Sequence, residues 1–470
     1  MAIIGRKTEQ EALNRIIESD EAEFVVVFGR RRVGKTFLIR EFFGNKFAFY
    51  HTGLANTGIE MQLHNFNDSL NNYGTGHYPK VQTWFDSFKQ LKQLLSNSRK
   101  KGKKVVFIDE MPWMDTSRSG FLAALEHFWN GWASGQKDIL LIVCGSATSW
   151  IIDKLLNNHG GLHNRVTQHI YLRPFTLSEC EEYYQKRRLV LSRHEIVENY
   201  MIFGGIPFYL SLMQKQFSMF QNVDNLLFAE NAALKNEFQN LYASLFKKAE
   251  NHIKIVEALS SKTKGLTREE IIKITKLPDG GSLNRTFNEL ELSGFIRRYK
   301  GYRKKERKSL YQLVDFYTLF YFNFLKNHAF DEHFWTNFIE NARHRAWSGY
   351  AFEQVCLAHL PQIKQKLGIS GVLTKTYSWI SNDSENGAQI DLVIERNDRV
   401  INLCEMKYAS EEFKIDKKQD ENLRNKRATF KEETKTRKAL HLTMITTYGI
   451  KRNQYRGNIQ SEITVNDLFI

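Results

Sequence analysis

The sequence predicts an α/β protein of several compact parts, and three successive patterns along the chain indicate this. Up to about residue 200, short apolar runs alternate with helical stretches, as in a parallel sheet covered on both faces. From about 200 to 340 helical periodicity dominates, and after 345 a long helix, three strands, a charged helix and another strand follow. We expect an α/β core at 1–175, a helical lid at 176–245, a helix-and-hairpin domain at 246–325 and a second α/β domain at 340–470.

Composition places the chain among cytoplasmic globular proteins. Its 470 residues, 42% hydrophobic and 25% charged, argue against a disordered or fibrous chain. No apolar run approaches the roughly 18 residues of a membrane span, and the N-terminus does not resemble a signal peptide. The four cysteines are far apart and form no C-x-x-C, which argues against a zinc site or disulfide framework. We expect a reducing, cytoplasmic location and no membrane partner.

The charge balance favours a polyanionic partner. Lys and Arg number 67 against 52 Asp and Glu, a formal net charge of +15. Nucleic acid is the commonest polyanion in the cytoplasm, although an excess of this size also serves plain solubility.

The first candidate site is a phosphate-binding loop. Gly29-Arg30-Arg31-Arg32-Val33-Gly34-Lys35-Thr36 fits G-x-x-x-x-G-K-[ST], after the strand EFVVVF and before the helix TFLIREFF. The backbone N–H groups of such a loop wrap phosphates, Lys35 would reach the β- and γ-phosphates, and Thr36 would hold Mg²⁺. The sequence therefore predicts ATP and Mg²⁺ as cofactors.

Two later strands bring further candidates to this site. Val105–Ile108 ends in Asp109, expected to hold Mg²⁺, and Glu110, expected to polarise the attacking water. Ser146, at the end of ILLIVCGSAT, would lie beside the γ-phosphate or cap the next helix. Arg165 would sense a nucleotide or remain a solvated side chain.

Together these motifs resemble the archaeal-type ATPases of the STAND branch of AAA+-related P-loop proteins. The resemblance covers about residues 1–320 and includes Ile4-Gly5-Arg6 with Glu9, C-G-S, N-R-V, L-R-P-F and Gly204-Gly205-Ile206-Pro207. It implies a P-loop NTPase fold and an ATP-driven switch with an attached winged helix, often self-associating as a homo-oligomer. Family members usually have Gly-Arg where this chain has Asn164-Arg165.

Residues 249–315 predict a winged helix-turn-helix. Thr267 and Glu270 form a capping box, and a hairpin follows Gly294. The hairpin segment 297–308 holds eight basic residues and one acidic residue, which suits a phosphate backbone. The alternative is a packing module whose wing contacts the ATPase core. The predicted DNA contacts are Arg297, Arg298, Lys300, Arg303, Lys304 and Lys305.

The second candidate site is a carboxylate cluster in the C-terminal domain. Asp391 and the pair Glu405 and Lys407 occupy neighbouring predicted strands, and a strand period of two puts Glu405 and Lys407 on one face. Asp391 and Glu405 can chelate Mg²⁺, Lys407 can orient or deprotonate water, and Glu353 on the preceding helix can complete the shell. The set resembles the PD-(D/E)XK nuclease core, a restriction-endonuclease-like α/β fold. The alternatives are an inactive nuclease fold or a salt-bridged strand pair.

These features predict an ATPase whose nucleotide state controls a metal-dependent DNA endonuclease. A second hypothesis is an ATP-driven regulatory switch that binds DNA or a protein, with a non-cleaving nuclease-fold scaffold. A third, a motor that translocates or remodels DNA, requires ring assembly.

Overall fold

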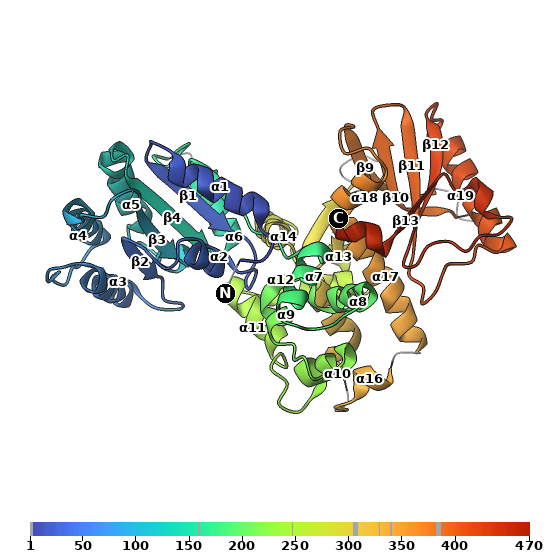
Figure 1. Ribbon diagram of the computed structural model, residues 1–470, viewed down its shortest axis with the longest axis horizontal. Helices are drawn as coiled ribbons and strands as arrows, with labels where there is room; N and C mark the ends of the chain where they lie inside the picture. Colours follow the sequence, from blue (N-terminus) through green and yellow to red (C-terminus); the bar gives the residue numbers. More distant parts are fainter. Residues whose placement is uncertain are drawn as a thin grey trace. The chain divides into compact units, whose positions relative to one another are not determined.

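The computed structural model describes residues 3–157, 160–246, 248–303, 309–328, 330–338, 341–381 and 387–470. The chain divides into two compact units, Met1–Pro174 and Phe175–Ile470 (Figure 1). This division lies beside the boundary predicted at residue 175. The other three expected domains all lie within the second unit, and the boundaries between them stay predictions.

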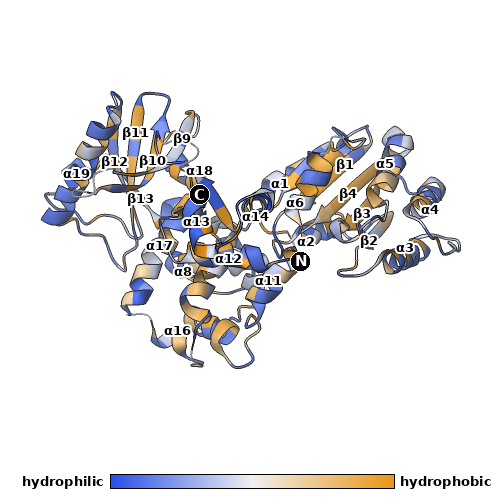
Figure 2. Cartoon of the chain, turned by 180° about the vertical axis from the view of Figure 1, so that it is seen from behind, coloured by the Kyte–Doolittle hydropathy of each residue, from blue (hydrophilic) through white to orange (hydrophobic). Residues whose placement is uncertain are grey.

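A five-stranded parallel sheet forms the centre of the first unit, with strand order β2-β3-β4-β1-β5. The three predicted strands are its three central ones, and they are hydrophobic along most of their length (Figure 2). Because parallel strands end at one edge of a sheet, the loops after β1, β3 and β4 meet there. The strands are β1 (Glu23–Phe28), β2 (Phe49–Thr52), β3 (Lys104–Asp109), β4 (Ile139–Gly145) and β5 (Gln168–Tyr171).

Helices cover this sheet as the alternating pattern predicts. Alternate sheet residues such as Phe24 and Val26 join one core cluster with apolar side chains of α3, α4 and α5. Short α2 begins directly after the loop that follows β1. The helices are α1 (Lys7–Glu18), α2 (Lys35–Phe42), α3 (Ile59–Tyr73), α4 (Trp84–Asn97), α5 (Phe121–Gly131) and α6 (Thr148–Ile151).

The second unit begins with helices and continues into three helices with a small antiparallel sheet. The sheet has strand order β6-β8-β7, and the predicted capping box of Thr267 and Glu270 begins α13. The first helices are α7 (Leu177–Lys186), α8 (Arg193–Phe203), α9 (Pro207–Ser211), α10 (Met219–Val223) and α11 (Glu237–Leu245). The next elements are α12 (Glu250–Ser260), β6 (Leu266–Thr267), α13 (Arg268–Thr275), α14 (Gly281–Leu292), β7 (Ile296–Tyr299) and β8 (Leu310–Leu313).

A second five-stranded sheet, with order β13-β12-β11-β10-β9, follows in the C-terminal part. Strands β9, β10 and β11 are antiparallel, whereas β11, β12 and β13 are parallel. The elements after β8 are α15 (Phe316–Phe320), α16 (Phe334–Asn337), α17 (Ala342–Ala358), α18 (Leu360–Lys366), β9 (Thr374–Ile380), β10 (Gln389–Arg396), β11 (Val400–Lys407), α19 (Lys417–Thr434), β12 (Ala439–Thr446) and β13 (Ser461–Thr464). The predicted order of helix, three strands, helix and strand is present.

The long helix predicted at 346–367 is two helices in the structure. Helix α17 ends at Ala358, and α18 begins at Leu360 with Pro361 in its first turn. Proline has no N–H for the helical hydrogen bond, so the first helix cannot continue through this position. His359, at the break, accepts a hydrogen bond from the Leu177 N–H and so fastens α7 to this part of the second unit.

Candidate functional site

The loop between β1 and α2 has the backbone conformation of a phosphate cradle. Gly29 has φ of +143°, and a Cβ added there would lie 2.3 Å from the Leu172 carbonyl oxygen. Gly34 has φ of +91° and caps the N-terminus of α2. Lys35 is buried, and its Nζ donates to the carbonyl oxygens of Gly29 and Arg30, each at 3.0 Å. The ammonium group is therefore held by the loop itself, where phosphate oxygens would replace these carbonyls.

Thr36 and Asp109 meet beside this loop. The Thr36 hydroxyl donates to Asp109 Oδ2 at 2.7 Å, and the Cys144 thiol donates to Oδ1 at 2.6 Å. A hydroxyl oxygen beside a buried carboxylate, next to the cradle, is an oxygen set of the kind that Mg²⁺ prefers. The donor chemistry therefore fits Mg²⁺ here, with Thr36 and Asp109 as the predicted holders.

Ser146 contacts Glu110 in the structure. Glu110 follows β3 with φ of +45°, and its carboxylate accepts hydrogen bonds from the Ser146 hydroxyl at 2.9 and 3.0 Å and from its N–H at 3.2 Å. Ala147 is the N-cap of α6, so the expectation that Ser146 caps this helix is wrong. The Ser146 hydroxyl instead donates its hydrogen bond to Glu110, the residue expected to activate water.

The arginines near the loop differ in exposure. Arg30 is buried, Arg31 and Arg32 are half-buried, and the Arg165 side chain is exposed. Arg6 Nη2 donates to the Val33 carbonyl at 3.3 Å, which ties the N-terminal Ile4-Gly5-Arg6 segment to the phosphate loop. The predicted contact of Arg165 with a nucleotide stays a prediction.

Gly29→Ala is expected to abolish ATP binding and to lower the melting temperature. An alanine at this φ is strained, at a cost of about 1–3 kcal/mol, and its methyl group would overlap the Leu172 carbonyl oxygen. Calorimetric titration with ATP and thermal unfolding measure the two effects. Gly58→Ala is the matched control, because a Cβ there meets nothing within 4 Å. If Gly29→Ala binds ATP with wild-type affinity, the backbone of the loop can bind ATP in another conformation and the positive φ at Gly29 is not required.

The predicted carboxylates of the second unit lie together at one end of β10 and β11. Leu392 pairs with Cys404 across these strands, so Asp391 and Glu405 are the next positions along them. The pairing of β10 with β9 shifts register between Ile390 and Val393, so Asp391 lies in a bulge, a device that redirects side chains beside functional sites. Asp391 Oδ2 accepts from the Met406 N–H at 3.0 Å.

Glu353 and Lys407 complete the predicted set, and the charges in it influence one another. Burial, followed by the charge of Asp391, raises the pKa of Glu353 to about 8. Burial, followed by the charge of Glu405, raises the pKa of Asp391 to about 6. Burial alone would lower the pKa of Lys407, but the charges of Glu405, 2.9 Å away, and of Asp391 and Glu353 together outweigh burial and raise that pKa. Neighbouring carboxylates whose charges raise the pKa values of Glu353 and Asp391 form an environment that a divalent cation would stabilise.

The donor chemistry of this cluster thus fits Mg²⁺, with Asp391 and Glu405 as holders. Their positions are not yet those of a closed coordination shell, because no three His, Cys, Asp or Glu side chains among the described residues are grouped closely enough to hold a metal. Glu405 is instead engaged by lysines.

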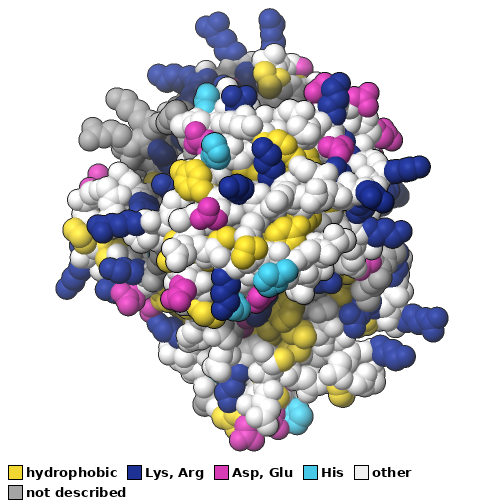
Figure 3. All heavy atoms as spheres, turned by 90° about the vertical axis from the view of Figure 1, so that its left-hand side faces the viewer, with side chains coloured by type: hydrophobic (Ala, Val, Ile, Leu, Met, Phe, Trp, Pro, Cys, Tyr) yellow, Lys and Arg dark blue, Asp and Glu magenta, His cyan; other side chains and the backbone are white. Residues whose placement is uncertain are grey.

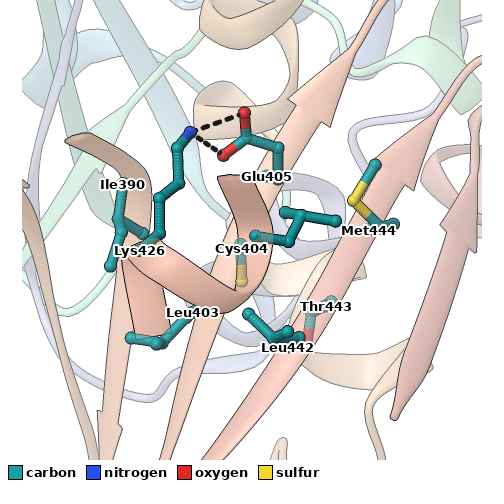
Figure 4. A pocket seen from close by; sticks show the side chains of 9 residues that line it. Ile390, Leu403, Cys404, Glu405, Lys426, Leu442, Thr443 and Met444 are labelled. Atoms are coloured by element: carbon teal, nitrogen blue, oxygen red, sulfur yellow. Dashed lines mark hydrogen bonds and ion pairs between the residues drawn. The ribbon is translucent and has the colours of Figure 1, made fainter. Parts of the chain in front are cut away.

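One of these lysines was missed by the sequence analysis. Lys426 of α19 donates to both carboxylate oxygens of Glu405, at 2.8 and 2.7 Å (Figure 4). The helix is mostly hydrophilic and reads as a solvated surface (Figure 2). A signal was nevertheless present: Leu423, Lys426 and Phe430 have the i, i+3, i+7 spacing of one helix face, and Leu423 and Phe430 are core residues.

The residue after Lys407 links the cluster to helix α8. The Tyr408 hydroxyl donates to Glu198 Oε1 at 2.8 Å and lies 3.1 Å from His194 Nε2. The His194 ring also stacks on the rings of Tyr408 and Tyr448. The end of β11 is therefore held by a helix that precedes it by about 200 residues in sequence.

Several predicted DNA-contacting residues make internal contacts. Arg297 Nε donates to Gln312 Oε1 at 2.9 Å, and its charge acts on Tyr350 and Glu353 of α17. The Arg303 guanidinium donates to the Thr434 carbonyl at the end of α19.

The residues that follow β7 lie along the edge of the C-terminal sheet, where Gly301 forms a bridge with Ser378. Tyr302 is buried in the core cluster of that sheet, its N–H donates to the Ser378 carbonyl of β9 at 3.0 Å, and its hydroxyl lies 3.2 Å from Glu395 Oε1. The described residues of the wing therefore have a packing partner in the C-terminal sheet, and the expected alternative, a wing packed on the ATPase core, stays a prediction. Arg298 and Lys300 are exposed, and Lys304 and Lys305 lie outside the described residues.

Comparison with known proteins identifies the first part of the chain. Residues 4–213 match the family model of an ATPase domain predominantly from Archaea. The chain is 24% identical over 410 residues to the uncharacterized protein MJECL04 of Methanocaldococcus jannaschii, covering 86% of this chain and 87% of that one. It is 46% identical over 43 residues to the ATP-binding protein MJ0423 of the same organism, covering 9% of this chain and 73% of that one.

A solved structure supports the fold. The Walker-type ATPase PABY2304 of Pyrococcus abyssi superposes with a TM-score of 0.50 at 17% identity, covering 68% of this chain and 96% of that one. The predicted α/β fold with a P-loop ATPase sheet is confirmed, and residues 4–213 carry an archaeal-type ATPase domain. None of the described helices has both the length and the apolar character of a membrane span.

Proposed function

We propose that this protein is an ATPase whose nucleotide state controls a metal-dependent DNA endonuclease in its C-terminal sheet. The observation that carries the proposal is the convergence of Glu353, Asp391, Glu405 and Lys407 from one helix and two strands. A scaffold has no use for three neighbouring carboxylates in this partly buried place, because burial and the neighbouring charges raise the pKa values of Glu353 and Asp391 and so make their ionisation costly.

At the phosphate loop, Lys35 would neutralise the β- and γ-phosphates, and Thr36 and Asp109 would hold Mg²⁺. Glu110 would accept a proton from the water that attacks the γ-phosphorus, after its carboxylate leaves Ser146. The bond to the β-phosphate oxygen breaks as the new oxygen–phosphorus bond forms.

At the carboxylate cluster, Asp391 and Glu405 would hold a divalent cation that polarises the scissile phosphate and lowers the pKa of water. Lys407 would orient the attacking water or take its proton. The water oxygen would form a bond to phosphorus as the bond from phosphorus to the leaving deoxyribose oxygen breaks, and that oxygen would take a proton from solvent. Glu353, half-buried beside Asp391, would support the shell.

Control by nucleotide is supported by the packing of helix α8. This helix lies within the family match at 4–213, yet it belongs to the second unit and binds Tyr408, next to Lys407. A movement of α8 during the ATPase cycle would therefore bear directly on the end of β11.

The second candidate is an ATP-driven switch that binds DNA or a protein, with a non-cleaving nuclease-fold scaffold. The ion pairs of Glu405 with Lys407 and Lys426 favour it, because they leave this carboxylate engaged without a metal. Self-association is a further proposal from the family resemblance, as is cytoplasmic location from the cysteine pattern.

Incubation of the full-length protein with plasmid DNA, ATP and Mg²⁺ or Mn²⁺ tests the leading proposal. Nicked or linear product that depends on Asp391 supports an endonuclease. Absence of cleavage with every metal and nucleotide would instead favour the ATP-driven regulatory switch.

DNA binding by a winged helix formed by residues 250–313 is proposed from its exposed basic residues. Figure 3 shows basic side chains mixed with acidic ones over one face of the molecule. The net positive charge of the chain therefore does not by itself identify this face as a DNA-binding surface. The hairpin offers Arg298 and Lys300 to solvent.

Arg298→Ser with Lys300→Ser is expected to weaken duplex binding and reduce its salt dependence. Each lost phosphate contact lowers the log–log slope by roughly 0.9, so the pair lowers it by about 1.8. Fluorescence titrations at several salt concentrations measure the slope. The control is Lys89→Ser, which removes an exposed basic residue of α4, outside the proposed winged helix. An unchanged slope in the double variant would place the DNA elsewhere.

A further inference from the structure

Lys426 occupies the carboxylate that the proposed metal site needs. Its Nζ contacts both oxygens of Glu405, and Lys407 contacts Oε1. Lys426 is 12% exposed and Glu405 9%, so this ion pair is largely removed from solvent, unlike Lys407, which is 40% exposed.

The surroundings strengthen the electrostatic interaction. Glu405 and Lys426 line a small pocket between α19 and the sheet, together with apolar side chains that include Leu423, Leu442 and Met444 (Figure 4). Apolar walls keep solvent screening low, so a charge placed here acts strongly on its neighbours. Lys426 also acts on Asp391, since its charge lowers the pKa of that carboxyl against the larger effect of burial.

A carboxylate offers about four lone-pair positions, and the two lysines use three of them on Glu405. A divalent cation bound by Asp391 and Glu405 would lie close to the Lys426 ammonium and be repelled by it. Loss of Lys426 would remove this repulsion. Lys407 would still hold Glu405 Oε1, so the carboxylate would keep much of its orientation.

We propose that Lys426 is a built-in competitor for the divalent cation: it neutralises Glu405 in the metal-free protein and thereby sets how tightly the cluster holds a metal. It is a positioning residue that acts through Glu405. The inference rests on the metal site of the proposed function, and it adds a determinant from α19 that lies outside the strand motif.

The test is calorimetric titration of the full-length, nucleotide-free protein with Mn²⁺. Lys426→Met is expected to lower the Mn²⁺ dissociation constant about tenfold, equivalent to roughly 1.4 kcal/mol. Lys426→Gln, which keeps a hydrogen-bond donor but not the charge, should shift it in the same direction. Lys426→Arg, which keeps the positive charge, should retain the wild-type value, and Lys418→Met, at an exposed lysine on the same helix, should leave it unchanged.

Repeating the titration in an Asp391→Ala background separates this site from the phosphate loop, because the gain from Lys426→Met should disappear there. An unchanged or weaker Mn²⁺ affinity in folded Lys426→Met and Lys426→Gln would overturn the inference. Plasmid cleavage is measured separately on the same proteins. If Lys426→Met binds Mn²⁺ more tightly but no protein cleaves the plasmid, the endonuclease proposal fails and the inference on Lys426 stands. If the wild type cleaves the plasmid but Lys426→Met binds Mn²⁺ no more tightly, the endonuclease proposal stands and the inference fails.

Discussion

Asp391→Ala is expected to abolish metal-dependent DNA cleavage and to leave ATP hydrolysis at the wild-type rate. Without this carboxylate the cation loses one of its two proposed holders, and loss of several kcal/mol of transition-state stabilisation lowers the rate at least about a thousandfold. The ATPase should be unaffected because the phosphate loop belongs to the other compact unit. Plasmid nicking and phosphate release, measured on the same preparation, report the two activities.

The control for this variant is Asp398→Ala, which removes an exposed carboxylate from the turn between the same two strands. Lys407→Ala should also stop cleavage but keep most of the metal affinity, because an ammonium group does not ligate a cation. Cleavage by Asp391→Ala at the wild-type rate would show that the carboxylate cluster is not the nuclease site.

The sequence predicted the central strands of the first sheet. These strands are buried on both faces, so their residues form continuous apolar runs. Strands β1, β3 and β4 are central, covered on both faces, and read as EFVVVF, KVVFID and ILLIVCG. The edge strands β2 and β5 read as FYHT and QHIY, with polar residues on a partly exposed edge. Their positions depend on pairing with the central strands, and no local pattern predicts them.

The carboxylate cluster was predictable because a strand has a fixed period. Glu405 and Lys407 had to share a face, and the order of elements brought Asp391 beside them. Lys426 had no such motif, and the many charged residues of α19 obscured its place on the buried face between Leu423 and Phe430. A helix that is polar on most of its surface can still direct one lysine side chain toward the core.

The hairpin shows a second limit on what the sequence alone can predict. Its sequence is strongly basic, and charge alone suggested a phosphate backbone as its partner. Tyr302 and Arg303 instead contact Ser378 and Thr434, residues about 75 to 130 positions later in the chain. Long-range docking of this kind depends on the shape of the assembled sheet, so the sequence of the hairpin could not distinguish it from DNA contact.

Glu110→Gln is expected to keep ATP binding and to slow hydrolysis by roughly 10²- to 10⁴-fold, the usual contribution of a general base. Glutamine keeps the size of the side chain and can still bond to Ser146, but it cannot take a proton from water. Calorimetric titration with ATP and single-turnover phosphate release separate binding from chemistry. Lys35→Ala is the contrasting control, since removing the ammonium from the cradle should abolish binding itself. If Glu110→Gln hydrolyses ATP as fast as the wild type, water must be activated by another group.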